Sequence, residues 1–600
     1  MNKSVSERVK ALQSLMEQKG IDTYIVLSSD AHQSEYVGRY WMARAWISGF
    51  TGSAGTVVIT RDKAACWVDG RYFLQGEKQL AGSGVSLMKM GEPGVPAWDE
   101  WVLSETPDKG TVGIDGRTIG NFQADALKRK LSSKGLTLSC REDLVGQIWE
   151  DRPSLPLDPI WDFSAEYAGE TRQEKIGRLR KHMEERKADY YLVASLESSA
   201  WLLNFRGNDI QDTPVAYAFT LVGMDSCDLF IEKAKVTAEM EQKLAGDGVT
   251  VRGYGELPER MAQIEAAKEE GRTIRIDLDL KYINQLLVES IPSSWKLVKE
   301  DTDAVIMMKA LKNPVEQENV RKAHIKDGAV MVQLLKYVKD HAADGLTECD
   351  VADWLDQKRR DQANSLGISF ETIAGYGPNG AIVHYKPERP GCAVIRPEGF
   401  LLVDSGAQYQ EGTTDITRTI ACGPLTEEMK EAYTLVLKGH LQLGHAIFKE
   451  GVTGTNLDVL ARKPLWDRGL DYKHGTGHGV GFVLSVHEGP QNISYGLNRI
   501  KLQPGMVISD EPGFYPTGKF GVRIENLVMV MPHLENEWGR FFRMEAITYC
   551  PYEREAIVKE MLSPEEIRWV DEYHQQVYEL VAPLLDEEHK AFLKDVTRPL

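Results

Sequence analysis

Apolar residues recur at helical spacing near both ends of the chain. In residues 1–20 they lie at Val9, Leu12, Leu15 and Met16, which predicts an amphipathic helix. Near the C-terminus, residues 563–566 (SPEE) form a capping box, a sequence that begins many helices. We expect a helix there that packs on the protein or on a partner subunit, because apolar positions keep the same spacing at Ile567, Val570, Val577, Leu580, Val581 and Leu584.

A long helix is predicted in the middle of the chain. Asn313 is a preferred N-cap residue, Pro314 suits the first helical position, and Glu316 suits the third. We expect this helix to extend from residue 314 to about residue 341. Strands that end in polar clusters follow it.

The first half of the chain contains an internal repeat. Residues 22–28 (DTYIVLS) match 189–195 (DYYLVAS), and residues 46–52 (WISGFTG) match 201–207 (WLLNFRG). The short strand ending at Asp115 matches the one ending at Asp277. Copies of this length predict two related α/β domains rather than a solenoid. The proline-rich stretch 151–159 predicts the link, so we expect domains at 1–155 and 156–312, followed by a third part at 313–600.

Composition excludes several classes of protein. The 600 residues carry 71 lysines and arginines against 89 aspartates and glutamates, a formal net charge of -18. This argues against a nucleic-acid binder, which needs basic surface, and against docking on anionic membranes. There is no run of about 18 apolar residues, the length of a transmembrane helix. The seven cysteines are scattered without a Cys-x-x-Cys pair, which predicts a cytoplasmic setting.

Acidic residues follow several predicted strands in the last third of the chain. The apolar residues 400–403 lead to Asp404, and the strand candidate 413–420 carries Asp415. Their short separation predicts a hairpin that brings the two carboxylates to one place. A third strand, 506–509, leads to Glu511. A fourth, 521–525, alternates, so Arg523 and Glu525 should point to the same face.

The glycine-rich loop 474–481 (HGTGHGVG) lacks the Gly-Lys-Ser/Thr ending of a phosphate-binding loop. Its glycines would instead let the backbone approach a site closely while His474 and His478 point into it. Four carboxylates crowded on one sheet would repel one another unless cations compensate them. Four carboxylates and one imidazole suit a pair of manganese, iron or cobalt ions better than a thiolate-type zinc site.

These residues resemble the five metal ligands of the pita-bread metallopeptidases, in the same order: Asp404, Asp415, His478, Glu511 and Glu525. The surrounding strings VDSGAQY, TTDITRT, HGTGHGVG, DEPGFY and VRIEN carry the resemblance. Residues 370–385 are similar to the segment ahead of the first ligand in aminopeptidase P. The repeat resembles the paired N-terminal domains of the three-domain, cytosolic-type aminopeptidase P, and the tail from about Arg543 resembles its C-terminal extension. The resemblance implies two α/β domains followed by a pita-bread α+β catalytic domain.

The resemblance also implies a role for each residue. Asp404 would chelate one ion, Asp415 and Glu525 would bridge both, and His478 and Glu511 would complete the second. Glu511 would also be the catalytic base. Other residues would surround the ligands. His384 and His487 would hold the substrate and stabilise the tetrahedral intermediate, with His474 as a further member of this group. Tyr515 and Arg523 would orient the site, and Arg71, in residues 69–72 (DGRY), would hold the far end of the substrate.

The implied activity is hydrolysis of the bond between an N-terminal residue and a penultimate proline in peptides. Two divalent ions are implied, with Mn²⁺ expected and Co²⁺, Fe²⁺ or Zn²⁺ as alternatives, in a homodimer. A prolidase that accepts only X-Pro dipeptides is the first alternative activity, although known prolidases usually have one N-terminal domain. The second is a non-catalytic pita-bread protein that binds peptides or histones, whose usual sign is loss of ligands. A methionine aminopeptidase would not need the N-terminal half.

Overall fold

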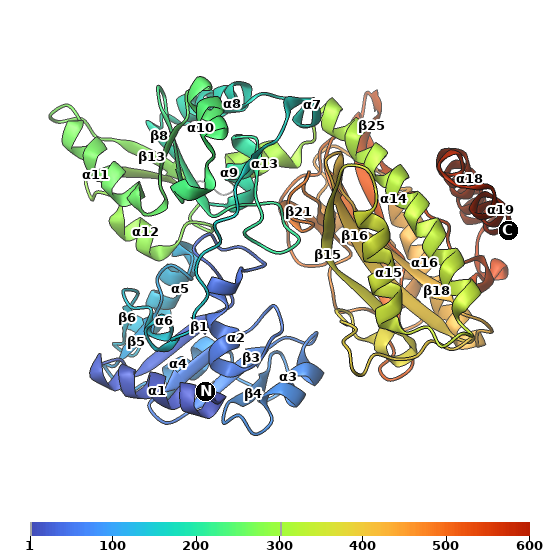
Figure 1. Ribbon diagram of the computed structural model, residues 1–600, viewed down its shortest axis with the longest axis horizontal. Helices are drawn as coiled ribbons and strands as arrows, with labels where there is room; N and C mark the ends of the chain where they lie inside the picture. Colours follow the sequence, from blue (N-terminus) through green and yellow to red (C-terminus); the bar gives the residue numbers. More distant parts are fainter. Residues whose placement is uncertain (1–2, 300–302) are drawn as a thin grey trace. The chain divides into compact units, whose positions relative to one another are not determined.

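The computed structural model describes residues 3–299 and 303–600. Within it the chain forms two units. Unit 1 contains Met1–Phe163, Thr171–Gln211 and Val215–Val305, and unit 2 contains Ser164–Glu170, Asp212–Pro214 and Ile306–Leu600. Figure 1 shows the course of the chain through both units. No helix in the described ranges combines the length and the apolar character that a membrane span requires.

Unit 1 contains two six-stranded sheets with the same topology. The first has the order β4-β3-β2-β1-β5-β6 and the second the order β12-β11-β10-β8-β13-β14. In each, the first strand pairs antiparallel with the second and parallel with the fifth. The strands are β1 (Thr23–Leu27), β2 (Thr56–Thr60), β3 (Ala64–Val68), β4 (Ser86–Lys89), β5 (Thr111–Ile114), β6 (Thr137–Ser139), β8 (Tyr190–Val193), β10 (Ala218–Gly223), β11 (Cys227–Ile231), β12 (Thr250–Gly253), β13 (Arg275–Leu278) and β14 (Lys296–Lys299). The two related α/β domains expected from the repeat are therefore confirmed.

Helices accompany both sheets of unit 1. The predicted N-terminal helix is α1 (Val5–Gln18), and it buries Val9, Leu12 and Met16. The others include α2 (Ala43–Ser48), α3 (Phe73–Leu80), α4 (Trp98–Glu105), α5 (Asn121–Ser132), α6 (Leu144–Ile148), α8 (Arg172–Arg186), α9 (Leu196–Leu202), α10 (Ala238–Gly246), α11 (Leu257–Ala267) and α12 (Gln285–Ser290). The buried His32 joins the two domains through the backbone oxygen of Ala194 and the hydroxyl of Tyr254, at 2.7 and 2.8 Å. Residues 151–159, the predicted link, form no regular element.

The largest segment of unit 2, Ile306–Leu600, contains the predicted long helix, α14 (Pro314–His341), which Asn313 caps. A sheet follows in which β15 (Ser365–Tyr376) and β18 (Ile416–Ala421) both pair with β16 (Phe400–Tyr409), and β17 (Gly412–Thr413) continues it. The helices α14 and α15 (Glu348–Arg360) lie along this sheet (Figure 1). Val330, Leu355 and Leu401 represent the buried apolar layer between them. This layer holds β16, which carries the first predicted ligand.

Another sheet of unit 2 has six strands in the order β19-β26-β25-β22-β20-β21. Its strands are β19 (Ile447–Lys449), β20 (Gly477–Gly479), β21 (Glu488–Ile493), β22 (Val507–Asp510), β25 (Asn526–Asn536) and β26 (Gly539–Ala546). The helices α16 (Glu427–Gly444) and α17 (Gly454–Trp466) accompany it, and β23 (Gly513–Phe514) and β24 (Val522–Arg523) form a separate two-stranded ribbon. Together with the first sheet and its helices, this is the predicted α+β pita-bread domain.

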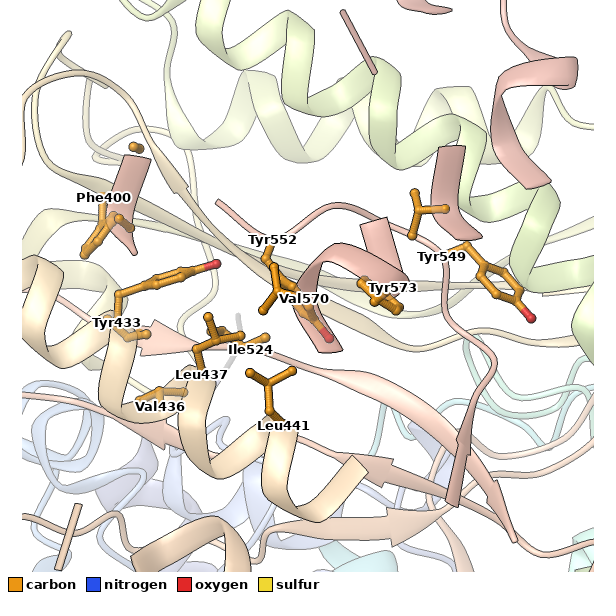
Figure 2. Close-up of a cluster of buried hydrophobic side chains, with 14 of the residues drawn as sticks. Phe400, Tyr433, Val436, Leu437, Leu441, Ile524, Tyr549, Tyr552, Val570 and Tyr573 are labelled. Atoms are coloured by element: carbon orange, nitrogen blue, oxygen red, sulfur yellow. The ribbon is translucent and has the colours of Figure 1, made fainter. Parts of the chain in front are cut away.

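The C-terminal helices belong to the core of unit 2. α18 (Pro564–Val581) starts at the predicted capping box and is followed by α19 (Glu587–Val596). Figure 2 shows Val570 and Tyr573 of α18 among side chains from α16, including Leu437 and Leu441. Burying these apolar side chains is the main source of stability in such a cluster. The predicted C-terminal helix therefore packs on its own chain.

Candidate metal centre

Two antiparallel strands bring the first two predicted ligands together. Asp404 lies on β16, directly opposite Thr417 of β18, and Asp415 immediately precedes β18. Both aspartates are buried, and the charge of Asp415 contributes to the raised pKa of Asp404 after burial itself. The predicted strand pairing is confirmed, and it brings the two carboxylates into electrostatic contact.

His478 on β20 and Glu525, which follows β24, form a cluster with Asp415. One ligand atom from each residue lies within 4.8 Å of those of the other two. The Nε2 atom of His478 is 3.4 Å from Asp415 Oδ2 and 3.5 Å from Glu511 Oε1. Because β16 and β18 belong to one sheet and β20 and β22 to another, the expectation that one sheet carries all the carboxylates is wrong. The centre is assembled from both sheets of unit 2.

The ring of His478 is oriented by the backbone of the next residue, Gly479. Its Nδ1 atom is 2.9 Å from the carbonyl oxygen of Gly479, so in the neutral ring Nδ1–H donates and the Nε2 lone pair faces Asp415 and Glu511. A backbone carbonyl on the remote nitrogen is the usual support of a metal-binding histidine. Burial works to lower the pKa of His478, but the carboxylates of Asp415 and Glu511 outweigh it and raise the pKa to about 9.

The carboxylates of this centre favour a bound cation. Burial, followed by the neighbouring acidic groups, raises the pKa of Glu525 well above its usual value. Burial also raises the pKa of Glu511, to about 7, although His478 and Arg523 act in the opposite direction. Oδ1 of Asp404 is buried without a hydrogen-bond partner among the described residues. Oxygen donors with one imidazole are the ligands that hard divalent ions prefer, so the donor set fits such ions.

Arg523 ties several of the predicted residues together. It donates from Nη2 to Asp404 Oδ2 at 2.6 Å, from Nε to Thr417 Oγ1 at 3.2 Å and from Nη1 to the Tyr515 hydroxyl at 2.8 Å. The Tyr515 hydroxyl is in turn 2.9 Å from His474 Nε2. Since His474 Nδ1 lies 2.7 Å from the oxygen of Gly475, Nδ1–H donates there and Nε2 accepts from Tyr515. A continuous hydrogen-bonded chain thus runs from Asp404 to His474.

The other two predicted histidines lie near the ligand cluster. The ring centroid of His487 is 4.3 Å from that of His478, and the planes are inclined by 66°. Burial raises the pKa of Asp404, whereas Arg523 and, more weakly, His384 work to lower it, which places His384 within electrostatic reach of that carboxylate. Arg523 Nη2 also lies 3.5 Å from the carbonyl oxygen of Val383. His384, His474 and His487 are therefore all adjacent to the cluster.

Arg71 belongs to unit 1 and lies in the turn after β3. Its guanidinium donates from Nε and Nη2 to the two carboxylate oxygens of Asp69, each at 2.8 Å. This bidentate pair holds the side chain at the surface of unit 1. The predicted contact of Arg71 with a substrate stays a prediction.

Two residues that form hydrogen bonds with the predicted ligands were not themselves predicted. Thr417 donates to Glu525 Oε2 at 2.7 Å, and Ser509 donates to Glu511 Oε1 at 3.2 Å while accepting from the backbone N–H of His478 at 2.9 Å. Period-two alternation could have identified Thr417, which lies two residues after Asp415 in TTDITRT. Ser509 lies two residues before Glu511 in the same way.

The chain matches known families over nearly its whole length. Residues 318–532 match the model of metallopeptidase family M24, and residues 540–600 match that of the C-terminal region of peptidase M24. Residues 8–142 and 151–316 each match a model of the creatinase/prolidase N-terminal domain. The chain therefore belongs to metallopeptidase family M24, with two creatinase-type N-terminal domains.

Individual proteins give a more specific comparison than the family models. A probable Xaa-Pro aminopeptidase P of Neurospora crassa is 41% identical over 610 residues, covering 98% of this chain and 87% of that protein. The crystal structure of X-prolyl aminopeptidase from Caenorhabditis elegans, described as a cytosolic enzyme with a di-nuclear active site, superposes with a TM-score of 0.95 at 32% identity and covers 100% of both chains. The prolidase from Pyrococcus horikoshii, with a TM-score of 0.50 at 25% identity, covers 63% of this chain and 99% of its own.

Proposed function

We propose that this protein is a dinuclear metallo-aminopeptidase that removes the N-terminal residue from peptides whose second residue is proline. The observation that carries the proposal is the gathering of Asp415, His478 and Glu525 within 4.8 Å, with Asp404 and Glu511 in electrostatic contact with them. The likeness to the Neurospora and Caenorhabditis proteins, over the whole chain, supports the Xaa-Pro specificity.

The five ligands divide between two ions in our proposal. Asp404 would hold one ion, His478 and Glu511 the other, and Asp415 and Glu525 would bridge both. Two bound divalent ions would lower the pKa of a water molecule between them and polarise the scissile carbonyl. Mn²⁺ is the expected metal because the donors are mostly oxygen, with Co²⁺, Fe²⁺ and Zn²⁺ as alternatives.

Glu511 is the proposed general base. In the protein by itself burial raises its pKa to about 7. Bound cations would stabilise its carboxylate form, which is the form that accepts a proton from water. The hydroxyl of Ser509 donates a hydrogen bond to Oε1 of Glu511 at 3.2 Å. The proton that Glu511 takes from the attacking water would then be available for the leaving nitrogen.

The surrounding histidines are proposed to bind the substrate. His384 and His487 would donate hydrogen bonds to the carbonyl oxygen as negative charge develops on it, and would help to protonate the proline nitrogen. Tyr515 and Arg523 would orient the site. Burial lowers the pKa of His474 to about 3, so this ring would serve as a neutral member of the same group. Arg71 is proposed to hold the far end of longer peptides.

The prolidase alternative is less well supported. The Pyrococcus prolidase covers only 63% of this chain, and unit 1 contains two related domains. A non-catalytic role finds no support in the donor set, because all five predicted ligands are present. We also propose, from the family resemblance alone, that the enzyme is a cytoplasmic homodimer that acts on peptides.

The function is tested by metal analysis and an assay on one preparation. We expect the purified enzyme to contain two divalent ions per chain and to cleave an Arg-Pro-Pro peptide after the arginine. Exhaustive chelation should abolish cleavage, and Mn²⁺ should restore it best. An Arg-Ala-Pro peptide is the matched control and should not be cleaved. Full activity in the metal-free protein, or hydrolysis of X-Pro dipeptides alone, would refute the proposal.

A further inference from the structure

Two cysteines of unit 2 lie next to a short antiparallel contact. Thr347, the N-cap of α15, forms an isolated antiparallel bridge with Val394. The backbone N–H of Glu348 donates to the oxygen of Ala393 at 3.0 Å, and the N–H of Ala393 donates to Glu348 Oε2 at 2.7 Å. The next residue on each side is a cysteine: Cys349, at the second position of α15, and Cys392, directly before Ala393.

The backbone around these cysteines is held firmly. Glu348 is fully buried at the first position of α15. Its carboxylate accepts from the N–H of Tyr376 at 2.7 Å, from Asn379 Nδ2 at 2.9 Å and from the Tyr385 hydroxyl at 2.8 Å, in addition to Ala393. This carboxylate therefore connects the start of α15 to residues 376–385, which precede Cys392, and to Ala393, which follows it.

Each thiol shifts the pKa of the other, so the two sulfur atoms lie near each other. Both are free, and Cys392 is half-buried whereas Cys349 is buried. Burial works to raise the pKa of Cys392, but the thiol and backbone N–H of Cys349 and the hydroxyl of Thr347 outweigh it and lower the pKa. Burial and Cys392 raise the pKa of Cys349 to about 12. The more accessible sulfur is thus the better nucleophile, and the other is kept beside it as a thiol.

We propose that Cys349 and Cys392 form a redox-active dithiol that hydroperoxides oxidise to an intramolecular disulfide. The Cys392 thiolate attacks the terminal oxygen of the hydroperoxide. The O–O bond breaks, an alcohol (or water, from hydrogen peroxide) leaves after taking up a proton, and Cys392 becomes a sulfenic acid through a two-electron oxidation. The sulfur of Cys349 then attacks that of Cys392. The S–S bond forms, the S–O bond breaks, and hydroxide leaves as water with the proton of Cys349. A small-molecule dithiol reverses the reaction by exchange.

The two cysteines are separate in sequence from the five proposed metal ligands. The disulfide would close a loop from residue 349 to residue 392, and this loop contains His384. The five proposed metal ligands lie at residues 404–525, outside the loop. Oxidation should therefore leave the metal content unchanged. The site does not depend on the proposed activity, so the two proposals can fail independently.

The test uses the metal-loaded full chain treated with tert-butyl hydroperoxide, then alkylated and digested with trypsin, which cuts between the two cysteines after Arg359 and Arg360. We expect a cross-linked peptide pair that contains Cys349 and Cys392 and that disappears after treatment with dithiothreitol. The Cys349→Ser variant should instead accumulate a sulfenic acid at Cys392 that dimedone traps. The Cys392→Ser variant should leave Cys349 unoxidised.

Cys140→Ser is the matched control, because Cys140 is a buried cysteine of the other unit; it should form the same cross-link as the wild type. Mass spectrometry of the wild-type protein decides the question even if a variant fails to fold. Recovery of Cys349 and Cys392 as separately alkylated thiols after peroxide treatment would overturn the proposal. So would dimedone labelling of Cys349 in preference to Cys392.

Discussion

Arg523 donates from Nη2 to Oδ2 of Asp404 across 2.6 Å, and both side chains are buried. This ion pair leaves the other carboxylate oxygen of Asp404 without a hydrogen bond among the described residues. The arginine therefore compensates part of the negative charge of the cluster and orients one carboxylate, while an oxygen remains available as a ligand. A buried arginine paired in this way costs several kcal/mol to leave unpaired, so Asp404 and Arg523 should act as a unit.

The first prediction concerns Asp415, which we propose bridges the two ions. Asp415→Asn should lose at least one ion and nearly all turnover, because an amide is a weaker ligand and carries no charge. The fold should survive, since the change relieves repulsion among buried carboxylates. Metal analysis, steady-state kinetics and circular dichroism on one preparation check this. Near-normal rates with a full metal complement would show that Asp415 is not a ligand.

The second prediction separates substrate binding from metal binding. His384→Ala and His487→Ala should each keep both ions, because the five ligands do not include them. Each should lose about 10²–10⁴-fold in turnover, the usual effect of removing a group that stabilises the transition state. The exposed His533 of β25 provides the control, and His533→Ala should behave like the wild type. If either variant lost its metal in parallel with its activity, the substituted histidine would be a metal ligand.

The third prediction tests the support of Glu525 by Thr417. Thr417→Val removes the hydroxyl that donates to Glu525 at 2.7 Å and accepts from Arg523 at 3.2 Å. Loss of such an outer hydrogen bond typically weakens metal binding about 10–100-fold. Isothermal titration calorimetry with Mn²⁺, after a chelator has removed the metal from the protein, would measure this affinity. Thr220 is a buried threonine in a strand of unit 1, so Thr220→Val is the control and should leave the metal affinity unchanged. Equal metal affinities for the two variants would show that Thr417 does not support metal binding.

The fourth prediction concerns acid stability. Burial lowers the pKa of His574 in the folded protein to about 3, and its Nε2 accepts from the N–H of Tyr552 at 3.1 Å. Between pH 6.5 and about 3 the unfolded chain protonates this imidazole and the folded protein does not. Stability therefore falls as the pH falls through this window, by about 1.4 kcal/mol per pH unit for one such group.

His574→Gln should reduce that pH dependence while keeping an acceptor for Tyr552. Urea unfolding at pH 6.5, 5.5 and 4.5 measures the slope, and the variant should be less sensitive to pH by about 1.4 kcal/mol per pH unit. His533→Gln is the control, because its side chain is exposed in the folded state. Identical slopes for wild type and His574→Gln would show that His574 does not titrate as stated.

Short sequence patterns were sufficient to predict an element whose formation depends on residues close together in the chain. Asn313 and Ser563 cap α14 and α18 as predicted, because a capping side chain bonds to backbone N–H groups only two or three residues away. The hairpin signal likewise predicted the pairing of β16 with β18. The convergence of strands from two sheets on one centre could not be predicted in this way, since the contact between Asp415 and His478 spans a long stretch of intervening chain.

The sequence by itself determined the repeat in unit 1, the helices α14 and α18 of unit 2 and the residue types of the candidate metal centre. Spacing and motif order are properties of the chain, so they can be read without coordinates. Only the tertiary structure decided which neighbours each side chain meets. The hydrogen-bonded chain from Asp404 to His474, the hydrogen bond from Thr417 to Glu525 and the bridge between Thr347 and Val394 all depend on packing between distant segments. Such contacts form because burial brings apolar surfaces together and the polar groups carried with them must then find partners.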